Sequence, residues 1–129
     1  MSIKKDVPNL KDKICDSIFN FDDRIRFVGI VNQNSEVIEG GFKKGIEPLL
    51  DMTEEQDMYL QSISNMTFFQ SFSNKFGPVD YLITKQKKIT MMTFPYNKNI
   101  LCLSVSSFAD VDKIRDMVLN SITFSLKDH

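Results

Sequence analysis

Few residues of this 129-residue chain could do acid–base or nucleophilic chemistry. The one histidine is His129, the last residue, and the two cysteines are Cys15 and Cys102. A serine or cysteine nucleophile needs a firmly positioned proton acceptor, and a residue at a chain end is poorly held for that work. The cysteines form no Cys-x-x-Cys pair and have no histidine near them in the sequence, so we predict neither a zinc site nor a redox pair. We expect both cysteines to be small buried hydrophobic side chains.

Carboxylates and glycines make no stronger case for catalysis. The acidic pairs stand at the boundaries of expected elements, where a solvated charge or a helix N-terminus accounts for them: Asp22-Asp23, Glu54-Glu55, and Asp110 with Asp112. The nearest approach to a phosphate-binding loop, residues 40–45, lacks the hydroxyl residue and the following helix of such loops. We therefore predict no catalytic, cofactor or metal site, and no enzyme activity.

Composition and charge exclude further classes of function. The chain has 16 Lys+Arg against 17 Asp+Glu, and 42% of its residues are hydrophobic. A nucleic-acid binder needs a clustered basic excess, which this balance does not favour. Residues 1–10 lack the apolar stretch of a secretory signal, and no window resembles a membrane span, so we expect a cytoplasmic protein that does not contact a membrane. We expect one domain over residues 1–129, with residues 1–8 flexible.

One small basic group remains to be explained. Lys85, Lys87 and Lys88 stand around the turn between the third and fourth expected strands. Lysine at a sheet edge commonly blocks edge-to-edge aggregation. The alternative is contact with an anion or a partner protein, and the sequence leaves both interpretations open.

Hydrophobic patterning predicts the elements that must position these residues. Apolar residues recur every three or four positions over residues 9–21 and again from Asp110, which indicates two amphipathic helices. Gly40-Gly41, within an expected strand, marks a bulge, a bend or the close approach of another element. Alternating or continuous apolar runs bounded by turn residues predict five strands, over residues 25–31, 36–42, 79–85, 88–94 and 99–105.

The pairing of these strands follows from their apolar faces. The strands at 25–31 and 99–105 are apolar on nearly both faces, so we expect them at the centre of a sheet. Hairpins join the first two strands and the last three. These constraints predict an α+β fold with one five-stranded antiparallel sheet of order 2-1-5-4-3, with helices on its faces, in the element order α-β-β-α-β-β-β-α.

The helix expected between the second and third strands is long and apolar on several sides. We expect it to begin with a capping box from Thr53 to Gln56 and to end at Phe76, before Gly77-Pro78. A helix that is apolar over most of its circumference must be covered on two sides, one of them by something other than its own sheet. The apolar residues that lead to this conclusion are Met58, Tyr59, Leu60, Ile63, Met66, Phe68, Phe69, Phe72 and Phe76.

These features together resemble the roadblock/dynein-light-chain family and, more broadly, profilin-like and longin-like domains. The resemblance rests on the strand pair at 26–31 and 37–41, the long capped helix and the last strand at 100–105. The stretches 26–29 and 101–105 also look like small archaeal proteins of unassigned function. The family resemblance implies a noncatalytic, homodimerising scaffold or regulatory domain and a small GTPase or other signalling partner. It places the dimer interface on Met58, Tyr59, Ser62, Met66, Phe69, Tyr81 and Ile83.

An alternative function is a small-molecule sensor of the PAS or GAF type. Such a domain would hold its ligand in a cavity of several hundred Å³ between the sheet and the helices. The side chains that would line the cavity are Phe27, Phe42, Met91, Phe94 and Phe108. Core packing by the same residues is the competing explanation, because protein interiors are close-packed.

Overall fold

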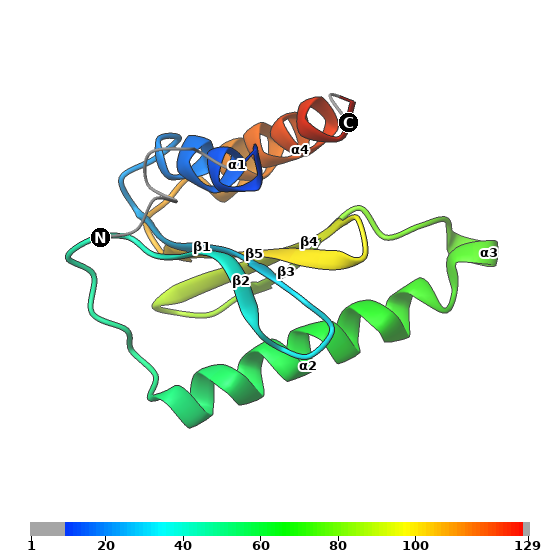
Figure 1. The fold of residues 1–129 in the computed structure, drawn as a ribbon, viewed down its shortest axis with the longest axis horizontal. Helices are drawn as coiled ribbons and strands as arrows, with labels where there is room; N and C mark the ends of the chain where they lie inside the picture. The colour runs from blue at the N-terminus through cyan, green and yellow to red at the C-terminus, as the bar shows by residue number, and fades with distance from the viewer. Residues whose placement is uncertain (1–9, 128–129) are drawn as a thin grey trace.

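A five-stranded antiparallel sheet separates two layers of helix (Figure 1). The computed structural model describes residues 10–127, and it describes side chains from Ile14 to Leu126. The expectations for His129 and for the flexibility of residues 1–8 lie outside these ranges. The elements are α1 (Leu10–Phe19), β1 (Ile25–Val31), β2 (Val37–Phe42), α2 (Met52–Gln70), α3 (Ser73–Phe76), β3 (Leu82–Lys85), β4 (Ile89–Tyr96), β5 (Asn99–Ser106) and α4 (Val111–Lys127).

The strand order is the one that the sequence predicts. The sheet runs β2-β1-β5-β4-β3, with β1 and β5 paired antiparallel, so the α+β prediction and the order 2-1-5-4-3 are confirmed. Helices α1 and α4 lie on one side of the sheet and α2 lies on the other (Figure 1). The sheet is therefore buried on both faces, which explains why its central strands are apolar on both.

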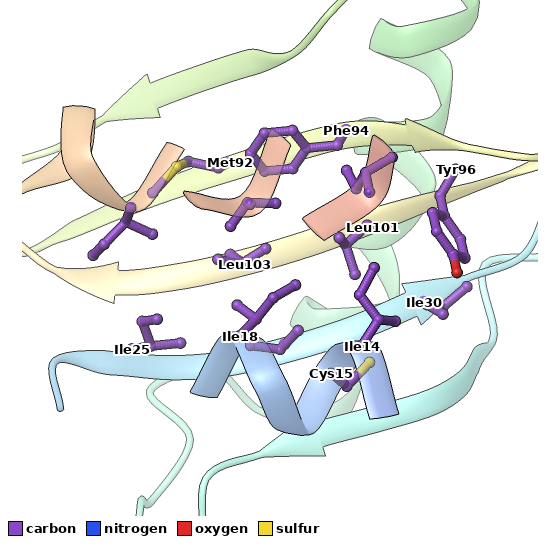
Figure 2. Packing of buried hydrophobic residues seen from close by; sticks show 14 of the residues in the cluster. Ile14, Cys15, Ile18, Ile25, Ile30, Met92, Phe94, Tyr96, Leu101 and Leu103 are labelled. Atoms are coloured by element: carbon purple, nitrogen blue, oxygen red, sulfur yellow. The ribbon is translucent and has the colours of Figure 1, made fainter. Parts of the chain in front are cut away.

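The larger core lies between the sheet and helices α1 and α4. Leu101 and Leu103 of β5 point into it together with Ile14 and Ile18 of α1 (Figure 2). The hydroxyl of Tyr96 lies 2.9 Å from that of Ser125 on α4, which gives its polar end a partner. The smaller core lies under α2 and contains the alternate residues of the same strands: Phe27, Val31, Ile100 and Cys102, with Tyr59 and Met66 from the helix.

Of the roles expected for Gly40-Gly41 (a bulge, a bend or the close approach of another element), Gly40 serves the close approach. A Cβ on Gly40 would lie 2.1 Å from the carbonyl oxygen of Val28 and 3.0 Å from Sγ of Cys15. Its φ of 80° also lies where side chains are disfavoured. The glycine therefore permits the close approach of β2 to β1 and α1. The β-bulge of this pair falls elsewhere, at the register shift between Ile30 and Val31.

The long helix differs from its prediction at both ends. Its N-cap is Asp51, whose side chain accepts a hydrogen bond from the Glu54 N–H at 2.8 Å, so the expected box at Thr53 is wrong. The helix does not run unbroken to Phe76, because α2 ends at Gln70 and α3 follows as a separate turn. At the break, the hydroxyls of Ser71 and Ser73 donate to main-chain carbonyls of α2, and such local bonds compete with helix continuation.

Two strand boundaries differ from the prediction by more than one residue. Strand β3 begins at Leu82, three residues later than expected, and β4 continues through Pro95 to Tyr96. The last β3–β4 pair joins Leu82 to Thr93, so Pro95 lies beyond the end of β3 and has a neighbouring strand on one side only. The missing N–H of proline is tolerated at such a position.

Candidate interaction surface

One row of α2 side chains lies beside the buried face of the helix. Met58, Ser62, Asn65 and Phe69 follow one another at spacings of four, three and four residues, which keeps them on one side of a helix. We call this row the α2 flank. Met58 and Ser62 are half-buried, whereas Asn65 is exposed and 46% of Phe69 is accessible. Within the described chain, the α2 flank is thus only partly covered.

Two of the predicted interface residues of α2 face their own sheet instead. Tyr59 and Met66 are 5% and 6% exposed and belong to the smaller core. The Tyr59 ring stacks on Phe27 with 5.8 Å between centroids, and its hydroxyl donates to Glu55 at 3.4 Å. Burial, followed by the nearby Glu55 carboxylate, raises the pKa of Tyr59 above its ordinary range. These two residues hold the helix on the sheet, and the α2 flank beside them stays partly exposed.

The predicted residues near the sheet edge point to the other side of the sheet. Tyr81 and Ile83 pack against the larger core. The guanidinium of Arg115 on α4 lies 5.5 Å from the Tyr81 ring centroid and is oriented by Asp112 and Asp116. Strand β3 is the last in the sheet, and no strand of residues 10–127 pairs with its outer side. The exposed feature of β3 is therefore its backbone edge more than these two side chains.

A small apolar hollow opens beside the N-terminal half of α2. Its volume is about 150 Å³. Apolar side chains from α2, the sheet and the segment before the helix make most of its wall. We call it the α2 hollow; it is lined by Arg26, Phe42, Leu49, Leu50, Glu55, Met58, Gln86, Ile89, Met91 and Ser104.

The five side chains expected to line a sensor cavity do not gather in one place. Phe42 and Met91 line the α2 hollow, and Phe27 lies in the smaller core. Phe94 belongs to the larger core on the other side of the sheet, and Phe108 is 85% exposed. An open groove of about 550 Å³ does lie elsewhere, between the C-terminal half of α2 and the hairpin turns at Asn32-Gln33 and Asn97-Lys98.

The fold has well-defined relatives among solved structures, although no family model and no curated protein sequence matches the chain. A Roadblock/LC7 domain from Streptomyces avermitilis superposes with a TM-score of 0.63 at 12% identity, over 90% of this chain and 97% of that one. The gliding protein MglB from Thermus thermophilus reaches 0.69 at 6% identity, over 91% and 88%. A structure of MglB with a tetrameric arrangement reaches 0.69 at 7% identity, over 90% and 87%. The chain has the Roadblock/LC7 fold.

Exposed aromatic side chains continue from the α2 flank over the end of α2 and into α3. The rings of Phe68 and Phe72 lie 5.3 Å apart between centroids, and those of Phe72 and Phe76 lie 5.7 Å apart. Phe68 is 58% exposed and Phe76 is 81% exposed. The Phe68 ring also lies 5.2 Å from the Phe69 ring between centroids, so these residues, which the sequence showed as an apolar surplus, continue from the α2 flank across the break after Gln70.

Charged and metal-binding groups add little to the candidate surface. Lys85, Lys87 and Lys88 are exposed around the β3–β4 turn, and their contact with an anion or partner stays a prediction. In the part of the chain that the structure describes, no group of three or more His, Cys, Asp and Glu residues could hold a metal ion. Over the same residues, no helix has the length and apolar character needed to span a bilayer. Both cysteines are buried, as the sequence predicts.

Proposed function

We propose that this chain is a noncatalytic scaffold or regulatory domain that forms a homodimer through the α2 flank and the outer edge of β3. The observation that carries the proposal is a row that includes a half-buried Met58 and a 46% exposed Phe69, beside a helix face already anchored by Tyr59 and Met66. Exposed apolar side chains on the uncovered side of a helix are typical of a protein interface.

The two edges of the sheet support β3 as the edge that meets the second copy. Strand β2, the other edge, is bulged opposite Ile30 and Val31 and holds Gly40 and Gly41 at positive φ. Bulges and irregular backbone blunt an edge strand against pairing. Strand β3 pairs with β4 in an unbroken register from Leu82 to Lys85, so its outer side offers regular backbone donors and acceptors.

The proposed dimer would act as a platform for a small GTPase or another signalling protein. The support for this part is the Roadblock/LC7 fold and the family resemblance, which implies such partners. MglB, one of the similar structures, is known in a tetrameric arrangement, which supports self-association of this fold. Purification of the tagged chain from its native cells, read by mass spectrometry, tests the platform. Enrichment of a small GTPase is expected, and the absence of any GTPase would contradict it.

Light scattering coupled to gel filtration tests the dimer itself. We expect a dimer at micromolar concentration, and Phe69→Asp should convert it to a monomer because a charge would be buried in the interface. Phe124→Asp is the matched control, since Phe124 is 70% exposed on α4, on the opposite side of the sheet. A monomeric wild-type chain, or a Phe69→Asp variant that stays dimeric, would contradict the proposed interface.

A small-molecule sensor is the second candidate, and the open groove of about 550 Å³ favours it. Volumes of roughly 300–1,000 Å³ are typical of ligand sites. A sensor would be stabilised by its ligand, so thermal unfolding in the presence of a metabolite collection tests it. A rise in Tm that Thr67→Trp in the groove abolishes would support a sensor, and no rise with any metabolite would count against it.

A further inference from the structure

We infer that the α2 hollow receives the Phe69 ring of a second copy of this chain, and that the two copies exchange these rings across a two-fold axis. The inference rests on the proposed homodimer and adds the contact that fixes its register. Each half of the contact is present in one chain, but the two halves lie at opposite ends of the same helix.

The size and chemistry of the α2 hollow suit one phenyl ring. Its volume is about 150 Å³. That is about the volume of an apolar cavity that accepts a benzene molecule, and the hollow is open on one side, so a ring can enter it. A ring that enters would exchange water for contact with the apolar part of the wall, which is formed by Phe42, Leu49, Leu50, Met58, Ile89 and Met91.

The two charged side chains of the hollow already have partners. Arg26 donates to the carbonyl oxygen of Glu47 at 3.0 Å, and the Glu55 carboxylate accepts from the Tyr59 hydroxyl. These bonds hold both charged side chains at the wall. The occupant therefore needs no charge of its own, which favours an aromatic hydrocarbon side chain over an ionic ligand.

A chain cannot fill its own hollow with Phe69. Met58 lines the hollow, and Phe69 lies eleven positions later on the same straight helix, which is about 16 Å along the axis. Phe69 nevertheless lies on the same side of α2 as Met58. Phe68 points about 100° away around the helix, so among the neighbouring rings Phe69 is the one in line with the hollow.

A two-fold axis brings the two halves together. When two copies of α2 pack antiparallel across such an axis, the N-terminal half of each helix lies beside the C-terminal half of the other. An axis that passes between Ser62 and Asn65 places Met58 opposite Phe69 and Ser62 opposite Asn65. Each dimer then contains two identical ring-in-hollow contacts, because an isologous interface repeats every contact.

The centre of the α2 flank is suited to this register. Ser62 is small, which allows two helices to approach within 8–10 Å, the usual interaxial distance. Its hydroxyl donates to the Met58 carbonyl at 2.9 Å and keeps its oxygen lone pairs as acceptors. The Asn65 side-chain oxygen accepts from Gln61 at 2.9 Å, which leaves its NH₂ group as the donor toward Ser62 of the second copy.

Complementation between two variants tests the exchange. Phe69→Ala removes the ring and leaves the hollow intact, and Met91→Trp fills the hollow and leaves the ring intact. Each variant alone loses both ring-in-hollow contacts of its dimer. We therefore expect the dissociation constant of each variant dimer to be at least roughly tenfold higher than that of the wild-type dimer. A mixture of the two contains one intact ring-in-hollow contact per heterodimer. We therefore expect tagged Phe69→Ala to capture untagged Met91→Trp in preference to untagged Phe69→Ala.

The outcomes separate this inference from the proposed function. A wild-type monomer overturns both. A wild-type dimer whose Met91→Trp variant is unweakened, or whose two variants do not prefer each other, keeps the homodimer and overturns the ring exchange. Circular dichroism establishes that each variant is folded. If Met91→Trp is not, Ser104→Leu fills the hollow from the neighbouring strand and replaces it in the same mixture.

Discussion

At the scale of single residues, Cys102 has the most unusual environment. Its side chain is fully buried between β1 and β4 under α2, and burial raises the pKa of its thiol to about 12. A buried thiol is reached poorly by reagents and stays neutral at physiological pH. The cysteine is therefore a packing residue of the smaller core, in agreement with the sequence prediction.

The raised pKa of Cys102 predicts an alkaline loss of stability. The unfolded chain releases the thiol proton near its ordinary pKa, whereas the folded chain retains it up to about pH 12. Between these limits the unfolded state binds fewer protons, so the free energy of unfolding falls as pH rises, by up to about 1.4 kcal/mol per pH unit. Urea unfolding of wild type and Cys102→Val from pH 8 to 10.5 measures this slope.

The variant should show a shallower slope above about pH 9. Tyr59, whose pKa is also raised, contributes in the same direction, and it remains in both proteins. Because the Cys102 thiolate also helps to raise the pKa of Tyr59, the difference between the two slopes reports the thiol together with its effect on Tyr59. Equal slopes would show that the thiol ionises alike in the folded and unfolded chains.

At the scale of elements, the start of α2 depends on one side chain. Asp51 accepts from the Glu54 N–H at 2.8 Å, and Glu54 accepts from the Asp51 N–H at 3.0 Å. We expect Asp51→Ala to lower the free energy of unfolding by about 1 kcal/mol, the usual value of an N-cap. Thr53→Ala, the matched control inside the helix, should change it by no more than about 0.5 kcal/mol. Urea unfolding distinguishes the two, and a larger effect at Thr53 would contradict the assigned cap.

The sequence alone contains two overlapping signals for this helix start. Asp51 with Glu54 and Thr53 with Gln56 both fit the capping-box pattern. The structure shows why the first prevails, because Gln56 donates its side-chain N–H to the Ser35 carbonyl at 2.9 Å. That bond joins α2 to the β1–β2 turn. A local pattern does not reveal a tertiary contact of this kind.

Prediction was more complete for strands than for the faces of α2. The central strands β1 and β5 were predicted from residues apolar on both faces, and both lie in the middle of the sheet. Helix α2 has apolar residues around most of its circumference, so periodicity could not say that Tyr59 and Met66 face the sheet. At β3, a shift of one residue exchanges the faces, so Leu82 and not Tyr81 packs with the smaller core.

At the scale of the whole molecule, helices cover the two faces of the sheet unequally. Helices α1 and α4 share one side, whereas α2 is the one long helix of the described chain on the other (Figure 1). The α2 hollow lies at this thinner side, between the helix and residues of β4 and β5. A second α2 packed beside the first would complete this layer, so the proposed dimer would supply the cover that the single chain lacks.

A domain completed by its own copy should be more stable when it is more concentrated. Dimerisation binds folded chains and not unfolded ones, so mass action raises Tm with protein concentration. Across a hundredfold range of concentration, scanning calorimetry should show a rising Tm for wild type and for Phe124→Asp. Phe69→Asp should unfold at one Tm throughout that range, equal to or below the lowest wild-type value. A wild-type Tm that does not change with concentration would mean that the single chain closes its second layer without a partner.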